Sequence, residues 1–184
     1  MKKYFLLIVC CLLPVIVLAI LSQANYKQQP PGSSLKNDNS SVVNSPSTEV
    51  GQIAADFSFT TIDGNTIQLS SLRGKPVIFS FALTTGCEPC IIEATNIREA
   101  QKQVSLEVIQ LAINSQDTMN DLKTFRETYG SPDWLIGYDK DLKIANTYKV
   151  KTPDTTIVVD GDGKIIYRDD GIPIESQTLV NLLK

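Results

Sequence analysis

The 184-residue chain contains no histidine. This absence excludes Ser/His and Cys/His catalytic groups and every metal site that takes an imidazole ligand. The formal net charge is -3, so the chain lacks the basic excess that is typical of nucleic-acid-binding proteins, and we expect no nucleic-acid partner. Cysteine is also scarce, because only Cys10, Cys11, Cys87 and Cys90 occur. The first two lie inside an apolar run, which leaves the second pair as the one that can meet soluble partners.

The apolar run extends over residues 5–21, after lysines at positions 2 and 3. A helix of this length reaches roughly 26 Å, just short of the ~30 Å hydrocarbon core of a bilayer. Small residues follow at Ser22 and Ala24, at the spacing that a signal peptidase needs. Residues 1–24 therefore fit either a signal-anchor or a cleaved signal peptide, and we favour the anchor.

The lysines at positions 2 and 3 favour a topology in which the N-terminus stays inside and the domain lies on the extracytoplasmic side. We thus expect a protein of the cell membrane with a single N-terminal anchor, which is secreted if the segment is cleaved. Residues 25–50 are rich in Gln, Pro, Ser and Asn and cannot bury enough apolar surface to fold. They are predicted to form a flexible tether, and an extended tether favours a monomer.

Residues 51–184 are predicted to form one α/β domain. Residues 57–61 and 66–69 flank an Asp63-Gly64 turn and predict a β-hairpin, and Pro76 to Leu83 form an apolar run typical of a central buried strand. Residues 134–138 form a short segment whose secondary structure is ambiguous from the sequence. The other predicted elements are a helical turn over 70–74, a helix after Cys87, a strand over 106–113, a helix over 117–129 with Met119, Leu122 and Phe125 on one face, a helix over 141–148, strands over 155–159 and 165–168, and a helix over 176–183.

The sequence Cys87-Glu88-Pro89-Cys90 lies where the central strand is predicted to lead into a helix. Two cysteines at this spacing can exchange electrons as a dithiol and a disulfide. The unpaired amides and the positive dipole end of a helix lower the pKa of a thiol at its start. We predict that Cys87 attacks the partner and that Cys90, one turn further into the helix and more buried, releases the mixed disulfide.

The two residues between the cysteines are expected to tune the pair. Pro89 fits the first turn of a helix without loss of a hydrogen bond and stiffens the ring. Glu88 adds negative charge beside the thiolate, which opposes ionisation and favours a reducing couple. An acid at a helix N-terminus is also favourable by itself, so this second interpretation of Glu88 stays open.

Glu93 follows Cys90 by three residues, on the same side of the predicted helix and among apolar neighbours. If it is partly buried, its raised pKa makes it a proton donor and acceptor for the cysteines. A solvated helix glutamate is the alternative.

Other interpretations of Cys87 and Cys90 are weaker. A disulfide that closes so short a loop stabilises by only roughly 2 kcal/mol, which makes a purely structural staple unattractive. A zinc half-site lacks further ligands, because the domain has neither histidine nor more cysteine, and we expect no metal. Two unrelated buried thiols would not explain the place of the pair at a helix start.

Thr152-Pro153 directly precedes a predicted strand. In this architecture such a proline is the natural place for a cis peptide bond, and it leaves the preceding backbone free to pair with an extended substrate. We therefore expect Thr152 and Pro153 to bind substrate beside the cysteines.

Several motifs over about residues 51–184 occur together in one order. They are Ala55-Asp56-Phe57, Leu72-Arg73-Gly74-Lys75-Pro76, Cys87-Glu88-Pro89-Cys90, Tyr148-Lys149-Val150 with Thr152-Pro153, and Val159 through Ile165. In these motifs the sequence resembles the TlpA/ResA-like, membrane-anchored thiol-disulfide oxidoreductases of the peroxiredoxin/redoxin superfamily. The resemblance implies a thioredoxin-like fold with an extra N-terminal β-hairpin and a central mixed sheet flanked by helices.

The combination of C-E-P-C with Glu93 is similar to the branch that reduces the heme-binding cysteines of apocytochrome c. The resemblance implies that Glu93 belongs to the active site and that a membrane electron donor of the CcdA type recharges the enzyme. It implies no cofactor besides the redox-active disulfide Cys87–Cys90. Related branches reduce other exported or spore-envelope proteins, so the protein substrate stays open.

Gly86 stands where the family usually has tryptophan before the first cysteine. Its presence implies a more accessible Cys87 and a less apolar substrate-binding surface. Trp134, the single tryptophan, is expected to lie in the core instead.

Three other functions compete with disulfide reduction. A thiol peroxidase of the peroxiredoxin type needs a threonine and an arginine about its cysteine; Thr84 is available, but no suitable arginine is apparent. A copper-delivery protein of similar fold normally requires histidine, which the chain lacks. A binding module without redox activity is the third.

Overall fold

The computed structural model of the chain describes residues 47–184. The predicted segment 1–24 and most of the predicted tether therefore lie outside the described residues. Of the tether, residues 47–50 are described, and the Ser47 N–H donates to the Ile53 carbonyl at 2.7 Å. Within the described part of the chain, no helix combines the length and the apolar character needed to cross a membrane.

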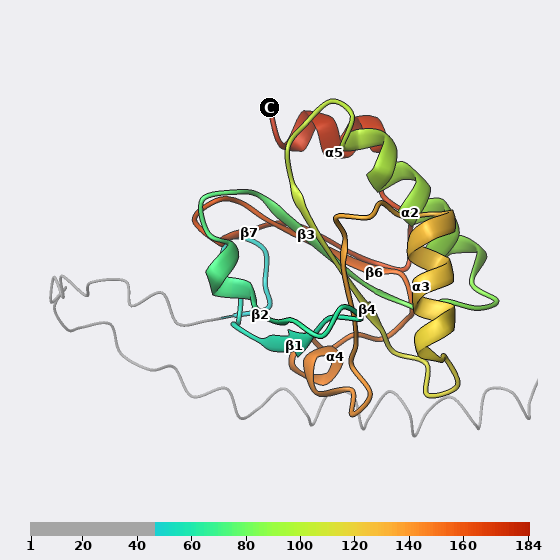
Figure 1. The fold of residues 1–184 in the computed structure, drawn as a ribbon. Helices are drawn as coiled ribbons and strands as arrows, with labels where there is room; N and C mark the ends of the chain where they lie inside the picture. The colour runs from blue at the N-terminus through green and yellow to red at the C-terminus, as the bar shows by residue number, and fades with distance from the viewer. Residues whose placement is uncertain (1–46) are drawn as a thin grey trace, which may run out of the picture. The chain divides into compact units, whose positions relative to one another are not determined.

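A five-stranded mixed sheet forms the centre of the described structure (Figure 1). Its strands are β3 (Val77–Ala82), β4 (Glu107–Ala112), β5 (Leu135–Tyr138), β6 (Thr155–Val159) and β7 (Ile165–Asp170). They follow the spatial order β5-β4-β3-β6-β7, in which β3, β4 and β5 are parallel and β6 is antiparallel to both of its neighbours. All six residues of β3 are buried, as the apolar run predicted for a central strand.

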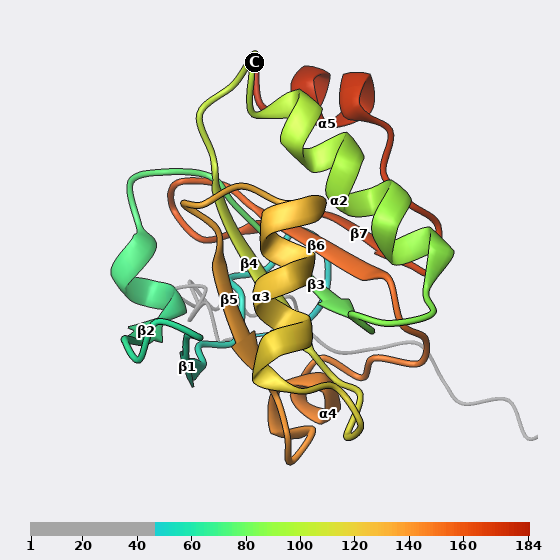
Figure 2. The same cartoon turned by 45° about the vertical axis from the view of Figure 1, so that its right-hand side comes forward.

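Three helices cover one face of this sheet, namely α2 (Glu88–Ala100), α3 (Met119–Thr128) and α5 (Ser176–Leu182). Parallel strands need crossover connections, and α2 and α3 supply them between β3, β4 and β5. The buried residues of the three helices share one apolar cluster with sheet residues such as Ile78 and Val158. Figure 2 shows α2 and α3 next to each other over the strands. The helix that begins after Cys87 is therefore held along its length.

The opposite face is covered by β1 (Ser58–Thr60), β2 (Thr66–Gln68), the 3-10 helix η1 (Leu69–Leu72) and α4 (Lys143–Thr147). β1 and β2 pair in antiparallel fashion, which confirms the predicted hairpin. Aromatic rings fill this side: the ring centroids of Phe79 and Tyr148 are 5.0 Å apart, and those of Phe57 and Phe79 are 5.4 Å apart. The predicted fold class, an α/β fold with a central mixed sheet flanked by helices and an extra hairpin, is confirmed.

The structure corrects the prediction for Met119 and resolves the ambiguous segment 134–138. Met119 is 50% exposed although Leu122 and Phe125 are buried, because it occupies the first position of α3 beside the exposed cap formed by Thr118 and Asp121. The ambiguous segment is strand β5. Trp134, just before it, is a core residue as predicted, and its indole N–H donates to Gln101 Oε1 at 2.6 Å.

Candidate redox site

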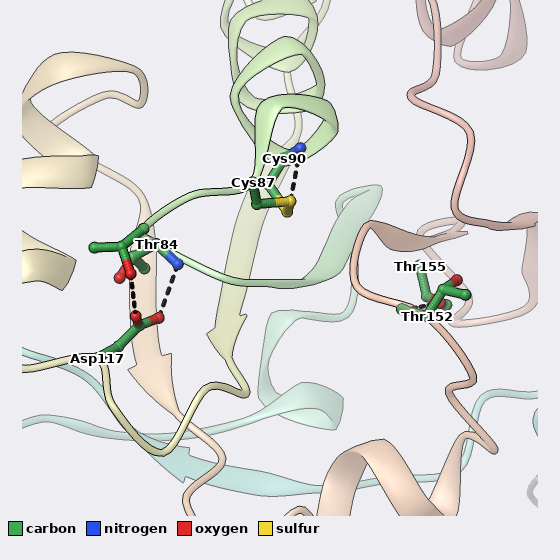
Figure 3. The surroundings of a disulfide bond; sticks show 7 residues. Thr84, Cys87, Cys90, Asp117, Thr152 and Thr155 are labelled. Carbon is green, nitrogen blue, oxygen red and sulfur yellow. Dashed lines mark hydrogen bonds between the residues drawn. A yellow bond between two sulfur atoms is a disulfide. The ribbon is translucent and has the colours of Figure 1, made fainter.

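The two cysteines lie where β3 passes through a short loop into α2 (Figure 3). They form a disulfide, with Cα atoms 5.3 Å apart. Cys87 is the N-cap of α2, and its Sγ accepts a hydrogen bond from the Cys90 N–H at 3.2 Å. Pro89 lies in the first turn, where its missing N–H costs no helical hydrogen bond. The local geometry is the one predicted for Cys87 and Pro89.

The two sulfur-bearing residues differ in exposure. Cys87 retains 9% of its surface and Cys90 only 1%. Both pack with Ala82 and Leu83 at the end of β3. Cys87 is thus the more accessible of the two residues, as expected, and the assignment of attacking and resolving cysteines stays a prediction. Glu88 is exposed at the first position of α2, and its tuning role stays a prediction.

Asp117 holds the loop that carries the disulfide. Its Oδ2 accepts from the Thr84 N–H at 2.8 Å, and its Oδ1 accepts from the Thr85 hydroxyl at 3.0 Å and from Asn114 Nδ2 at 2.8 Å. The prediction from sequence missed this residue. Since β3 and β4 are parallel neighbours, their carboxyl ends meet at one sheet edge, and an Asn-x-x-Asp sequence after β4 could have indicated it.

Gly86 adopts a left-handed conformation with φ of +70°. No atom lies within 4 Å of the position that a Cβ would occupy, so the space beside it is open. Glycine is favoured here for its backbone rather than for close packing. The effect of Gly86 on substrate binding stays a prediction.

Glu93 lies on the side of α2 that faces the sheet and is 1% exposed. Its Oε1 accepts from the Thr156 hydroxyl at 2.5 Å, and its Oε2 accepts from the Ile174 N–H at 2.6 Å. Burial, together with the nearby charges of Asp154 and Asp169, raises the pKa of Glu93 to about 8, although the hydrogen bonds from Thr156 and Ile174 oppose the rise. The burial on which the expected role depends is present, and the alternative of a solvated glutamate is wrong. The role of Glu93 in proton transfer stays a prediction.

The Thr152-Pro153 step precedes β6, and Figure 3 places Thr152 and Thr155 on the side of the disulfide opposite to Thr84 and Asp117. The expectation of a cis bond is wrong, because no peptide bond among residues 47–184 is cis. The chain reverses instead through Asp154, which has φ of +68°, and the Thr155 hydroxyl donates to the Thr152 carbonyl at 2.8 Å. Thr152 is exposed, and its contact with substrate stays a prediction together with that of Pro153.

Asp154 is a second residue that the sequence did not single out. It is 1% exposed, its N–H donates to the Phe81 carbonyl at 2.7 Å, and neither of its carboxylate oxygens has a hydrogen-bond partner. Burial and the charge of Asp169 raise its pKa to about 6. In the sequence, Asp154 is marked only by its place between a proline and a predicted strand. That place does not predict that its side chain is buried.

The described residues offer little to a metal ion. No group of three or more His, Cys, Asp or Glu side chains in residues 47–184 is arranged to hold one. The carboxylate of Asp160 serves its own turn instead, because Oδ1 accepts from the N–H groups of Asp162 and Lys164 at 3.0 and 2.8 Å. What the site can do follows from its sulfur atoms and from the carboxyl group of Glu93.

Comparison with known proteins agrees with this geometry. The AhpC/TSA family matches residues 50–168. Thiol-disulfide oxidoreductase ResA of Bacillus thuringiensis (strain Al Hakam) is 32% identical over 121 residues, which cover 64% of this chain and 68% of the relative. The putative peroxiredoxin bcp of Coxiella burnetii (strain RSA 493 / Nine Mile phase I) is 29% identical over 131 residues, which cover 65% of this chain and 86% of the relative.

Among solved structures, a thioredoxin-like protein from Aeropyrum pernix superimposes with a TM-score of 0.61 at 23% identity, over 69% of this chain and 87% of that chain. At this identity the likeness concerns the fold, which is thioredoxin-like as predicted. The family resemblance drawn from the sequence motifs is confirmed by these matches.

Proposed function

The chain belongs to the AhpC/TSA family and, within it, to the ResA-like thiol-disulfide oxidoreductases, and from this premise we propose that it reduces disulfides in exported proteins. One observation carries the proposal: a slightly exposed cysteine and a fully buried one share a disulfide at the N-terminus of α2, on the helix that also carries a buried carboxyl group. Such a pair passes two electrons without a bound cofactor.

The reaction proceeds in two exchanges from the dithiol form. The thiolate of Cys87 attacks one sulfur of the substrate disulfide, forms a mixed disulfide and releases the other substrate sulfur as a thiolate. Cys90 then loses its proton, attacks Cys87 Sγ and breaks the bond between Cys87 and the substrate. The two cysteines are oxidised by two electrons, and the substrate leaves as a dithiol after proton uptake.

The surroundings of Cys87 support its role as the attacking group. Helix N-terminal amides favour negative charge, and Cys87 Sγ already accepts the Cys90 N–H. Cys90 is shielded from partners at 1% exposure, so its thiol meets only Cys87 Sγ and the buried groups of α2 and the sheet. Glu93, one turn further along α2, is the carboxyl group assigned to proton exchange with Cys90.

The resemblance also supports the finer part of the proposal. Apocytochrome c is the proposed substrate, and other exported or spore-envelope proteins are the alternative. A membrane donor of the CcdA type returns the disulfide to the dithiol. These partners require the domain to lie outside the cell membrane, and in our proposal residues 1–24 anchor it there and residues 25–50 tether it as a monomer.

The decisive experiment traps the substrate on the full-length protein in its native membrane. Replacing Cys90→Ser leaves Cys87 able to attack but removes the resolving thiol, so a mixed disulfide should accumulate. Purification of that species and identification of the attached protein distinguish apocytochrome c from other exported proteins. Replacing Cys87→Ser is the matched control and should trap nothing. Unchanged disulfide reduction in both variants would contradict the mechanism.

A thiol peroxidase is the second candidate, favoured by the match to the AhpC/TSA family and by the buried Thr84 hydroxyl, which has no hydrogen-bond partner three residues before Cys87. It needs an arginine beside the cysteine. Arg98 is bonded instead to the Thr128 carbonyl, and Arg126 to Asp63. Peroxide-dependent turnover of the reduced protein tests this candidate, and we expect none above the rate of an ordinary thiol.

A further inference from the structure

The N-terminal end of β6 brings Asp154 to the redox site. Thr155 pairs with Phe81 of β3, and the N–H of Asp154 donates to the Phe81 carbonyl. The next residue of β3, Ala82, packs against both Cys87 and Cys90. Asp154 therefore lies beside the strand end that supports the disulfide.

The carboxylate of Asp154 is unusual because nothing compensates its charge. It is 1% exposed, and both oxygens lack a hydrogen-bond donor. Burying a carboxylate without donors is costly, and most buried polar groups in folded proteins have partners. A group in this state has no structural use as an anchor.

The charge of Asp154 acts on the buried Glu93 of α2. Asp154 lies two residues before Thr156, whose hydroxyl donates to Glu93. Both oxygens of Glu93 are held in place, by Thr156 and by the Ile174 N–H. Glu93 is therefore fixed in position, while the carboxylate of Asp154 has no hydrogen bonds.

The other groups that face Glu93 do not offset this charge. From β7, Asp169 contributes a second negative charge, and Tyr167 contributes a phenol whose pKa burial and the nearby acids raise. From the segment before α5, only the Ile174 N–H reaches it. From α2 itself, Cys90 lies one turn away. The charges that act on Glu93 are thus those of Asp154 and Asp169, and both are negative.

We propose that Asp154 is a positioning residue that acts through Glu93: its buried carboxylate, which has no hydrogen-bond donor, together with the burial of Glu93 itself, prepares Glu93 to exchange a proton with the Cys90 thiol. The inference rests on the proposed function and deepens it. An ordinary glutamate is too weak a base for a thiol, since the two pKa values differ by about four units. Efficient proton transfer needs the two values to be close.

The proton and the electrons balance in the resolving exchange. The Cys90 Sγ–H bond breaks, and the proton moves to the Glu93 carboxylate. The electron pair left on Cys90 Sγ forms the bond to Cys87 Sγ. The bond between Cys87 and the substrate breaks, and its electron pair leaves on the substrate sulfur, which takes a proton from solvent. During recharging by a dithiol donor, the same proton returns from Glu93 to Cys90.

The test uses Asp154→Asn in the full-length protein in detergent. Asparagine tolerates the left-handed backbone of this position, and it keeps the size of the side chain without its charge. Titration of the Glu93 carboxyl carbon by NMR, in the disulfide form, should show its midpoint about one pH unit lower than in the parent protein. Asp162→Asn, an exposed acid in the turn between β6 and β7, is the matched control and should leave the midpoint unchanged.

A second readout follows the chemistry. The reduced protein is mixed with glutathione disulfide as the probe, and the rate of the resolving step is measured against pH. We expect Asp154→Asn to shift the midpoint of this pH profile downward by about one pH unit, and Asp154→Glu to restore it in part. A merely structural role lowers the rate without moving the midpoint.

Asp154→Gly, which also accepts the left-handed backbone, replaces the asparagine variant if that one does not fold. An unchanged Glu93 midpoint in the folded variant overturns the proposal while leaving disulfide reduction intact. A parent protein that reduces no disulfide, yet shows the shifted midpoint, overturns the proposed function and keeps the coupling of the two carboxyl groups.

Discussion

Two buried aspartates near the disulfide differ in their hydrogen bonds. Asp117 is 6% exposed, and its oxygens accept from the Thr84 backbone, the Thr85 hydroxyl and Asn114. Asp154 is 1% exposed, and its oxygens accept from nothing. Figure 3 shows Asp117 bonded to the loop that leads to Cys87.

The difference in hydrogen bonding indicates how each aspartate affects the stability of the folded protein. A carboxylate with three donors is stabilised in its charged form and ties a loop together. A carboxylate without donors is destabilised, and its charge acts on its surroundings. Asp117 therefore stabilises the site, whereas Asp154 lowers stability and raises the pKa of Glu93. Removing the two charges should change stability in opposite directions.

The largest effect is expected at the residue on which Asp154 acts. Glu93 has a pKa of about 8 in the folded protein and near 4.5 when unfolded, so the unfolded chain loses this proton first as the pH rises. Stability then falls between about pH 4.5 and 8. Glu93→Gln mimics the protonated form and should raise the free energy of unfolding by about 4 kcal/mol at pH 9.

Urea unfolding of the full-length disulfide form at several pH values measures this effect. The difference between Glu93→Gln and the parent should vanish at pH 4, where both states carry the proton. A gain that is equal at pH 4 and pH 9 would show that the pKa of Glu93 is not raised.

The next effect has the opposite sign. Asp117→Ala removes the acceptor of three hydrogen bonds and leaves the Thr84 N–H unpaired, so the free energy of unfolding should fall by about 3 kcal/mol. Asp117→Asn retains one carbonyl acceptor and should lose less. Urea unfolding at pH 7 compares them, with Asp133→Ala as an exposed control. Equal stability of Asp117→Ala and the control would mean that this aspartate does not anchor the loop.

Asp154→Asn should stabilise the folded protein, in contrast to Asp117→Ala. The pKa of Asp154 is about 6 in the folded protein and 3.8 in the unfolded chain, so its burial lowers stability as the pH rises from about 3.8 to 6. Removing the charge should raise the free energy of unfolding by about 2 kcal/mol at pH 8 and leave it unchanged at pH 3. A loss at pH 8, like that of Asp117→Ala, would mean that Asp154 has donors after all.

The smallest effect concerns the loop that Asp117 holds. Gly86→Ala places a side chain in the left-handed region without a steric clash, so the cost should be about 1 kcal/mol from backbone strain alone. Gly161→Ala is the matched control, because Gly161 is not in that region and a Cβ there makes only ordinary contacts. Urea unfolding that gives the same value for both would exclude strain at Gly86.

The elements next to the cysteines could be predicted from sequence because each depends on the pattern within one segment. The apolar run before Cys87 predicts the central strand, and the helical spacing after Cys90 predicts α2, because both depend on neighbours in sequence. The prediction that Met119 lies on the buried face of its helix was wrong. Periodicity gives the face of a helix but not where the helix begins. The motif at Thr152-Pro153 misled about the peptide bond, since the turn is made by Asp154.

The sequence by itself determined the redox pair, its place at a helix start and the family, because these depend on residue types at short spacings. Only the tertiary structure decided the electrostatics. Glu93 meets Thr156 and Ile174, which lie 63 and 81 positions away, and Asp117 meets Thr84 across 33. Burial and hydrogen-bond partners come from such distant segments, and they distinguish a carboxylate that anchors a loop from one whose pKa is raised by burial.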